Sequence, residues 1–451
     1  MESGADSHIV LPLCFIIFFS VLNGVMFNVA VPSVKEEFHL LPSVVSWVVT
    51  GYIVVFALGS MLYGKLADSF AVRDLITLGL VLFNVGSMIG LLSHNYAMLL
   101  VGRLTQAAGA SSIPALAMIT ATRYFPASRK GAVLGAIAST VALSSAVGPI
   151  IGGFIAGAFH WRYIFLPTLC TLLMVPVLRR MLPADRPEVK PFDLTGALLL
   201  GATATLVLMF VTRVQWLLLA ISIVMLALFV LRTKHAASPF IDPALFRNAP
   251  YRNTVLTTFL CTGTFFGTIF MVPIMLRDLH GLDATHIGLI MSPGALSAVV
   301  MGTIGGRLSD RIGARSTVFA GMAMLFAGYL ILSTVCGMRP LVISISLVAC
   351  FSGFSFLQPS FPHAVSSELP RHQLGIGMGI YNLFFFLSGG FSGALIGRLL
   401  DFHRVGFHIN PLIANSEAWL YSNIFIMLAG SIVIASAIFF HTFSRASALE
   451  R

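Results

Sequence analysis

Charged residues are scarce in this sequence, and their scarcity excludes whole classes of protein. Only 10% of the 451 residues are Asp, Glu, Lys or Arg and 57% are hydrophobic, whereas soluble domains carry about a quarter charged residues. None of the 17 Asp and Glu residues falls inside the long apolar runs, and the 12 His residues lie in loops or at the ends of runs. The sequence therefore predicts a protein embedded in a lipid bilayer, and its net charge of +10 does not indicate nucleic-acid binding.

Catalytic and metal-binding patterns are missing as well. The five cysteines all fall within predicted spans and show no paired or metal-type spacing. The sequence has no HExxH, no GxSxG at a membrane face, and no cluster of Asp, Glu, His or Cys within its apolar runs. The rings of charge that are typical of channel filters are also absent. These absences argue against an enzyme, a channel, a bound metal and a cofactor.

Apolar runs of about twenty residues, the length that crosses a bilayer core, recur from end to end. The first eight residues lack the basic region of a secretory signal, so the first run is predicted to be a retained helix. Loops on the side of the termini hold 19 Lys and Arg against 7 on the other side, which predicts cytoplasmic termini. The fourteen predicted spans are 9–31, 44–63, 75–93, 97–119, 132–156, 163–178, 194–212, 216–232, 253–274, 287–305, 316–336, 340–358, 375–397 and 420–441.

Two segments that lie 242 residues apart share one pattern, which indicates an internal repeat. GKLADSFAVRD (64–74) and GRLSDRIGARS (306–316) both read G-x-L-[AS]-D, with an Arg five residues after the Asp. Each lies in a short charged turn between two spans, where the Asp is expected to pair with the Arg and to lock neighbouring helices together. The candidate gating residues in these turns are Gly64, Asp68, Arg73, Gly306, Asp310 and Arg315.

The repeat predicts an all-α polytopic membrane protein made of two homologous six-helix halves. The halves are predicted to cover 1–180 and 253–451. A polar, proline-containing linker and two further spans, 181–252, lie between them, which gives six plus two plus six transmembrane helices.

Several polar side chains of the first half are predicted to lie at membrane depth. Asn23 and Asn28 each need a partner there, and an interhelix hydrogen bond and a place in a water-filled cavity are both open. Arg103 is the one charge well inside a predicted span, where a charge costs about 2.5–3.5 kcal/mol on insertion scales. It is predicted to face a wet bundle interior with Gln106 one turn on, and the alternative is snorkelling to the nearer interface.

The fifth span carries SSAVGPIIGG (144–153), a stretch of small residues around a proline. Gly148 and Gly152 stand four residues apart and share one helix face, which a partner helix can approach closely. Pro149 removes one backbone hydrogen bond and is expected to loosen or kink the helix. We predict that this bare face, with Ser144 and Ser145 one turn earlier, lies at a seam that closes and reopens.

These motifs resemble those of the major facilitator superfamily. GKLADSFAVR and its second copy resemble its loop signature, Arg103-x-x-Gln106-x-x-Gly109 its fourth-helix motif, and SSAVGPIIGG the fifth-helix motif of its proton-driven antiporters. The fourteen spans and FDLTG (192–196) are similar to the fourteen-helix drug:proton antiporter branch, and the SVLN, YGKL and GPIIGG strings resemble the class K and class L tetracycline exporters. The resemblance implies a monomeric two-lobed carrier that opens to one face of the membrane at a time.

The chain departs from that branch where acidic residues are expected. Gly24, Ser145 and Gly389 stand where the tetracycline exporters have membrane glutamates, and Asn23 stands where the branch has an aspartate. An organic cation normally needs an acidic partner within the membrane. A neutral, zwitterionic or anionic amphipath, or a metal chelate of tetracycline type, therefore fits the sequence better.

The missing acids leave three coupling mechanisms open. A carboxylate near a cavity mouth can titrate, with Asp68, Asp278 and Asp310 as candidates. Alternatively, the substrate carries the proton and Arg103, which does not lose its own proton, serves as a fixed charge. In the third mechanism transport is uncoupled from protons.

The leading hypothesis is a cytoplasmic-membrane exporter of amphipathic drugs that confers antibiotic resistance by proton antiport, without any cofactor. Its partners would be the lipid bilayer and a small-molecule substrate. The alternative is an uncoupled facilitator or importer of a small metabolite on the same fold. The predicted cavity residues are Asn23, Asn28, Tyr52, Arg103, Gln106, Ser144, Ser145, Gln358, Asn382 and Phe385, with Phe265, Phe266 and Met271 as apolar candidates.

Overall fold

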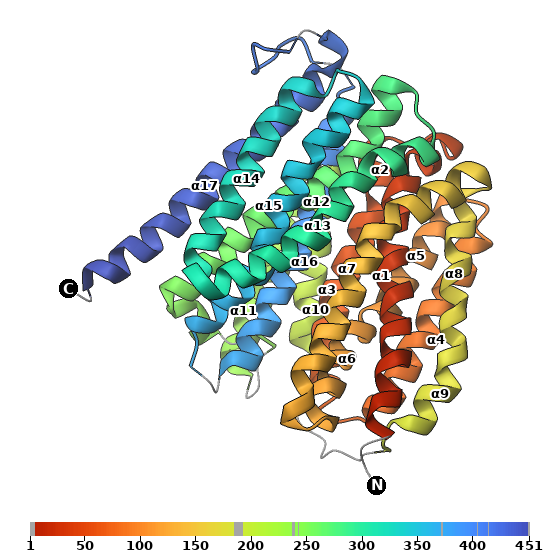
Figure 1. The fold of residues 1–451 in the computed structure, drawn as a ribbon, viewed down its shortest axis with the longest axis vertical. Coiled ribbons are helices and arrows are strands. Elements are labelled where there is room, and N and C mark those ends of the chain that lie inside the picture. The colour runs from red at the N-terminus through yellow and green to blue at the C-terminus, as the bar shows by residue number, and fades with distance from the viewer. Residues whose placement is uncertain are drawn as a thin grey trace.

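Long apolar helices make up most of the chain (Figure 1). The computed structural model describes residues 5–184, 193–236, 240–241, 243–370, 373–403, 405–413 and 415–449. Thirteen helices in this described part are long and apolar enough to cross a membrane. The main helices are α1 (Ala5–Glu37), α3 (Trp47–Leu66), α4 (Val72–Leu91), α5 (Tyr96–Ala110), α6 (Ser112–Tyr124), α7 (Ala127–Ala158), α10 (Leu194–Arg213), α11 (Trp216–His235), α12 (Ala249–His280), α13 (Ala284–Ile312), α14 (Ala314–Val335), α15 (Pro340–Ser367), α16 (Leu374–Leu400) and α17 (Trp419–Leu449).

The fourth predicted span, 97–119, is divided between two helices. α5 ends at Ala110 and α6 begins at Ser112, and neither is long enough to be one of the thirteen. Pro114 accounts for the break, because it has no amide hydrogen to donate to the carbonyl of Ala110 four residues earlier. This predicted span is therefore built from two helices, and the total of fourteen spans stays a prediction.

The sixth predicted span, 163–178, is also built from short pieces. The candidate crossing segment Trp161–Met181 consists of η1 (Trp161–Phe165), α8 (Leu166–Leu169), η2 (Cys170–Leu173) and α9 (Met174–Met181).

Local sequence signals place the ends of several helices. The side chains of Asn95, Asp193, Asn248 and Asp283 each accept a hydrogen bond from a backbone N–H in the first turn of the helix that follows. Gly281 ends α12 in the left-handed region, with φ of +63°.

The helices form two groups, which Figure 1 shows side by side. In the first group α1 packs against α7 and α4 against α5, and in the second α14 packs against α15 and α12 against α16. The groups meet where α7 contacts α13, α3 contacts α16 and α1 contacts α12. We call the end of the bundle where α1 starts the near face and the opposite end the far face. The exact predicted domain limits stay a prediction.

The two additional helices cover one of the contacts between the groups. α10 and α11 pack against each other, and α10 also touches both α3 and α16. The Trp47 indole donates to the Thr212 hydroxyl at 3.3 Å, and Leu208 of α10 lies in one cluster with Val54 and Ala394. α10 therefore screens the α3–α16 contact from the surrounding bilayer, while the α7–α13 contact has no such cover from α10 or α11.

Asp193 fastens this pair of helices at the near face. Its buried carboxylate accepts from the Arg232 guanidinium and the Gly196 amide, both at 3.0 Å, and from the Phe240 amide at 3.3 Å. The Phe240 carbonyl in turn accepts from the Lys65 ammonium of α3 at 3.2 Å. Burial alone would raise the pKa of Asp193, but these amides and the guanidinium outweigh it and hold the pKa below its usual range.

Replacing Asp193 with asparagine is expected to destabilise the protein by about 1–2 kcal/mol at neutral pH, because the ion pair with Arg232 is lost. A carboxyl with a depressed pKa stabilises the fold above its unfolded pKa, and that stabilisation disappears as pH falls through the folded pKa. The difference between native protein and variant should therefore shrink below about pH 4. Thermal unfolding in detergent across this pH range measures it.

Asp283→Asn is the matched control, because Asp283 also caps a helix but is exposed, and it pairs with the exposed His286. Asparagine caps helices about as well as aspartate, and an exposed ion pair contributes about 0–1 kcal/mol, so this variant should lose less stability than Asp193→Asn. Equal losses in the two variants would contradict the role assigned to Asp193.

Candidate transport site

Arg103 is almost completely enclosed between helices of the first group, with 1% of its surface exposed. Its Nη1 donates to the Asn23 side-chain oxygen at 3.0 Å and to the Gln106 side-chain oxygen at 2.7 Å. Its Nε points at the Val48 carbonyl oxygen, 3.4 Å away. Asn23 comes from α1, Val48 from α3 and Gln106 from α5, so this one side chain joins three helices.

Aromatic faces complete the surroundings of Arg103. The guanidinium carbon lies 4.0 Å from the Tyr52 ring centroid and 4.3 Å from that of Phe27. Ring faces attract a desolvated cation by about 2 kcal/mol. Hydrogen bonds and rings together stabilise a buried cation that has no carboxylate partner among the described residues.

The amides that bind Arg103 are themselves held in place. The Asn23 amide donates to the Ile164 carbonyl at 3.1 Å, and the Gln106 amide donates to the Ser87 hydroxyl at 2.8 Å. The Ser87 hydroxyl then donates to the Phe83 carbonyl at 2.7 Å. This chain of bonds fixes which atom of each amide faces the guanidinium.

The enclosure of Arg103 differs from both positions that the sequence analysis considered for this side chain. Arg103 does not snorkel to an interface, and it does not line an open cavity in this conformation. Asn23 and Gln106 are fully buried beside it, and Tyr52 is nearly so. The sequence placed Arg103 and Gln106 on one helix face, but Phe27 and Ser87 gave no signal, because their contacts depend on the packing of distant segments.

The candidate residues of the second group gather around phenylalanines. Phe266 of α12, Phe354 of α15 and Phe385 of α16 have ring centroids 5.7–6.3 Å apart. Gln358 and Asn382 lie close to them in the sequence and are exposed. Other candidates of this group have a packing role: Met271 is fully buried, and Phe265 is nearly so.

Aromatic side chains connect the two sets of candidates. Tyr52 stacks on Phe56, with 6.2 Å between the ring centroids, and Phe56 meets Phe386 edge-on at 4.9 Å. Phe386 contacts Phe385 at 5.1 Å. The sequence analysis missed Phe56 and Phe386, since apolar residues in an apolar span carry no distinguishing signal.

The glycine-rich stretch of α7 reaches the boundary between the groups by a different face from the one expected. A Cβ on Gly148 would lie 2.6 Å from Val25, and one on Gly152 would lie 2.7 Å from Met26, so these glycines pack on α1 within the first group. Gly153 faces α13 instead, and a Cβ there would lie 2.6 Å from the Ala284 carbonyl oxygen.

Pro149 also lies at this contact, since a Cβ on Gly288 of α13 would lie 2.2 Å from the Pro149 carbonyl oxygen. α7 nevertheless continues as one helix through Pro149. We call the contact of Pro149 and Gly153 with Gly288 the glycine seam. The Thr285 hydroxyl donates across it to the Gly153 carbonyl at 3.2 Å.

Ser144 and Ser145 precede the glycine seam by about one turn, and their hydroxyls donate to carbonyls of their own helix at 2.7 and 2.8 Å. Ser144 is fully buried, whereas Ser145 and Asn28 are half-buried.

Two ion pairs join α1 to α12 at the far face, and the acidic residue comes from α1 in one pair and from α12 in the other. The Arg277 guanidinium donates to both Glu36 carboxylate oxygens at 2.5 and 2.6 Å. Next to it, the Lys35 ammonium lies 3.1 Å from both Asp278 carboxylate oxygens. Asp278 also accepts from the Tyr421 hydroxyl of α17 at 2.9 Å.

In the first of the two charged turns at the near face, the structure does not have the predicted pairing. Asp68 lies 3.7 Å from Arg123 at the end of α6, and Arg73 lies 3.6 Å from its neighbour Asp74. Arg315 pairs with Glu368 at 3.2 Å. The prediction of an Asp68–Arg73 pair was wrong, because the end of α6 brings Arg123 to Asp68 while Arg73 lies beside Asp74 in the first turn of α4.

In the second turn the predicted Asp310–Arg315 pair stays a prediction, because the Asp310 side chain lies outside the described residues. A Cβ on Gly64 or Gly306 would meet no atom within 4 Å. Close packing therefore does not require glycine at either position.

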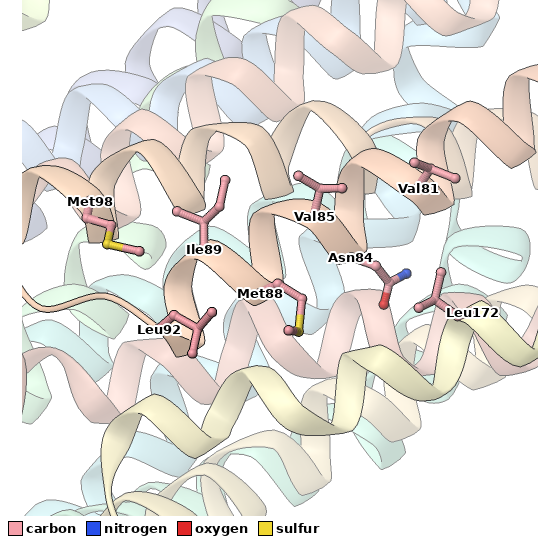
Figure 2. A pocket seen from close by; sticks show the side chains of 8 residues that line it. All are labelled: Val81, Asn84, Val85, Met88, Ile89, Leu92, Met98 and Leu172. Carbon is pink, nitrogen blue, oxygen red and sulfur yellow. The ribbon is translucent and has the colours of Figure 1, made fainter.

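A groove of about 340 Å³ lies between α4, the start of α5 and η2 (Figure 2). Val85, Met88 and Leu92 expose apolar side chains along it, as expected of a surface that faces lipid. The buried Asn84 amide donates to the Thr171 hydroxyl and the Leu80 carbonyl at 2.8 and 2.7 Å. The groove is separate from the Arg103 network and from the aromatic residues above.

Helices in two groups, a buried guanidinium and a glycine seam together define a polytopic membrane carrier. Residues 13–394 match the family model described as Major Facilitator Superfamily. The chain belongs to this superfamily, and it is a transporter rather than an enzyme.

Curated relatives span most of the chain. It is 27% identical to the riboflavin transporter RibZ of Clostridioides difficile, covering 91% of this chain and 93% of that protein. It is 24% identical to the multidrug transporter protein MdtP of Bacillus subtilis, over 86% of this chain and 74% of the relative. The multidrug resistance protein Stp of Mycobacterium tuberculosis is 26% identical, over 85% and 74%.

Solved structures share the fold at lower identity. A bacterial homologue of the human lysosomal transporter Spinster, in an inward-facing and unoccupied conformation, gives a TM-score of 0.71 at 14% identity and 98% coverage of both chains. A POT family transporter in complex with a thioalcohol-conjugated peptide gives 0.69 at 14% identity, covering 98% of this chain and 97% of that one.

Proposed function

We propose that this protein exports amphipathic small molecules from the cytoplasm by alternating access. The observation that carries the proposal is the closure of the far face. There the Lys35–Asp278 and Glu36–Arg277 ion pairs and the glycine seam join the two groups. Gln358 and Asn382, which lie closer to the near face, stay exposed. This is the arrangement expected of a carrier that is open towards the near face, which the charge distribution predicts to be the cytoplasmic side.

The charge of the site favours substrates without a strong positive charge. Arg103 is a buried cation, and the described carboxylates lie at helix ends or in the connections between helices. An organic cation would therefore meet no acidic partner at mid-membrane. A neutral, zwitterionic or anionic drug, including a tetracycline-type chelate, suits this charge balance.

The protein would work as a monomer in the cytoplasmic membrane and draw on the proton gradient, with no cofactor. The multidrug transporters among its relatives support an export role and a contribution to antibiotic resistance. Direction and driving force are tested together by expressing the chain in a drug-sensitive host. Lower drug accumulation that a protonophore reverses is expected, and unchanged accumulation across a panel of neutral and anionic drugs would sink the proposal.

A second function, a facilitator or importer of a small metabolite, is supported by the riboflavin transporter among the relatives. Facilitated transport would equilibrate its substrate across proteoliposomes at the same rate with and without a proton gradient. Export by antiport would be faster when the gradient is present.

Replacing Asp278 with asparagine is expected to reduce substrate-driven proton flux to background while downhill exchange of substrate continues. Of the three carboxylates considered for coupling, Asp278 is the one whose described contacts bridge the two groups, through Lys35. Loss of the carboxylate frees Lys35 permanently, so opening on the far face would no longer depend on this contact. Proteoliposomes that contain a pH-sensitive dye measure the flux.

Asp68→Asn is the matched control, since Asp68 pairs with Arg123 inside the first group and should leave coupling intact. Proton flux that survives in Asp278→Asn would favour a proton carried by the substrate. Loss of flux in Asp68→Asn alone would move the coupling role to the near face.

A further inference from the structure

A row of aromatic side chains crosses the boundary between the two helix groups. It runs from Tyr52 through Phe56 of α3 to Phe386 and Phe385 of α16, with ring centroids 4.9–6.2 Å apart. Phe56, Phe385 and Phe386 are only partly buried. The row therefore presents ring surface at the boundary itself, where a transported molecule must pass.

The row widens into a cluster in the second group. Phe385 contacts Phe266 at 5.7 Å and Phe354 at 6.3 Å, and Phe354 lies parallel to Phe265 with 3.8 Å between the centroids. Three helices, α12, α15 and α16, supply these rings. Phe265 and Phe354 are nearly buried, so they support the partly exposed rings of Phe266 and Phe385, on which a flat ligand can stack.

The exposed side-chain amides of Gln358 and Asn382 lie beside this cluster, at a similar distance from the near face. α15 runs from the far face to the near face, so Gln358 lies one turn closer to the near face than Phe354. α16 runs the opposite way, so Asn382 also lies one turn closer to the near face than Phe385 and Phe386. Because Phe354 and Phe385 touch, the two amides flank the same side of the cluster.

The direction of Asn382 follows from its helix face. Phe386 and Gly393, four and eleven residues further on, contact Phe56 and Thr50 of α3, and residues at these spacings share one helix face. Asn382 thus points from the second group towards the first. Neither Asn382 nor Gln358 has a hydrogen bond to another described residue.

The chemistry of these side chains specifies a ligand. A primary carboxamide offers a donor and an acceptor side by side, and it pairs two-pronged with a heterocycle edge that carries a matching pair. The charge that touches the row is the Arg103 guanidinium, which lies on Tyr52. A ring with a positive charge is therefore disfavoured, whereas an uncharged or anionic ring is accepted.

We propose that the aromatic row and its two amides bind a planar fused-ring heterocycle that has an amide or imide edge and no positive charge. The rings stack on Phe385 and its neighbours, and Asn382 and Gln358 recognise the edge. This inference rests on the proposed function and names the substrate class of the same site.

Binding and transport are measured separately on the full chain, with riboflavin as the imide-bearing probe. N3-methylriboflavin, whose imide hydrogen is replaced, and proflavine, a planar cation, are the comparison probes. Quenching of probe fluorescence on purified protein reports binding, and uptake into proteoliposomes reports transport. Native protein should bind riboflavin about tenfold more tightly than either comparison probe.

Asn382→Leu and Gln358→Leu should each remove most of the preference for riboflavin over its methylated analogue. Phe385→Leu should weaken the binding of both flavins about equally. Gln215→Leu, an exposed amide at the turn between α10 and α11, is the matched control and should behave like native protein. Because the two mutated amides are exposed, their replacement removes no internal contact, and unchanged unfolding temperatures would verify this.

Equal affinity for the two flavins, tighter binding of proflavine, or a preference that survives both leucine variants would overturn the inference. If neutral drugs are transported but no flavin binds, the inference fails while the proposed function stands. If riboflavin binds as described but neither it nor any drug in the panel crosses the membrane, the site assignment stands and the proposed function fails.

Discussion

Arg103→Ala is expected to abolish transport, with a loss of about 100-fold or more in initial rate. The substitution leaves the Asn23 and Gln106 oxygens without their donor in a buried site. Each unsatisfied buried acceptor costs about 1–3 kcal/mol. If this cost destabilises one conformation of the transport cycle by about 3 kcal/mol, the population of that conformation falls roughly 100-fold. Initial rates of substrate uptake and of substrate-driven proton flux in proteoliposomes measure the effect.

Arg103→Lys separates the charge from the geometry. Lysine keeps a positive charge, but its compact ammonium lacks the planar fork that reaches the Asn23, Gln106 and Val48 oxygens together. If Arg103 acts only as a fixed charge, the lysine variant should retain most of the transport. If Arg103 organises the junction of α1, α3 and α5, the lysine variant should be nearly as slow as the alanine variant.

Arg213→Ala is the matched control, because Arg213 is exposed at the end of α10 and makes no hydrogen bond to a described residue. It should transport at the native rate. Thermal unfolding in detergent distinguishes a folded, inactive Arg103→Ala protein from an unstable one. A folded alanine variant with native transport would show that the guanidinium serves stability alone.

The amino-acid pattern predicts the helices well but not their partners. Apolar runs of membrane-spanning length specify helices because backbone polar groups in lipid must bond within the segment. Spacing along one helix also predicts that Arg103 and Gln106 share a face. It cannot predict that Asn23, 80 residues earlier, supplies the next acceptor, because that contact depends on how α1 packs.

The glycine seam shows the same limit at the scale of one residue. Successive residues on a helix point about 100° apart, so Gly152 and Gly153 necessarily face different neighbours. Sequence alone identifies the bare stretch but does not indicate which face meets the other group. The structure assigns Gly152 to α1 and Gly153 to α13, and the two faces have different consequences for function.

The predicted local pair in the first charged turn failed for a related reason. Asp68 and Arg73 are close in sequence, yet the end of α6 brings Arg123 to Asp68. A flexible exposed pair contributes about 0–1 kcal/mol, so sequence proximity alone does not decide which Arg is chosen.

Gly288→Val is expected to stop transport almost completely while the protein remains folded. Its Cβ would lie 2.2 Å from the Pro149 carbonyl oxygen, a contact that exists only while α7 and α13 are close. Overpacking of this kind costs about 1–3 kcal/mol, which changes the ratio of two conformations by about 5- to 150-fold. The population should therefore shift towards a state open at the far face, from which a return cycle is slow.

Accessibility of a far-face cysteine measures this shift. Thr285→Cys, placed at the glycine seam in a Cys170→Ala background, should react faster with a membrane-impermeant maleimide when Gly288→Val is also present. Gly302→Val on the same helix is the matched control, because a Cβ there would meet no atom within 4 Å. It should leave both transport and labelling unchanged.

Gly152→Val distinguishes a conformational effect from a loss of stability. Its Cβ would lie 2.7 Å from the Met26 backbone within the first group, so this variant should lower the unfolding temperature without speeding the labelling. Gly288→Val should do the reverse, because its clash is relieved when the groups separate. Identical behaviour of the two variants would mean that α7 and α13 do not part during transport, and that the far face opens elsewhere.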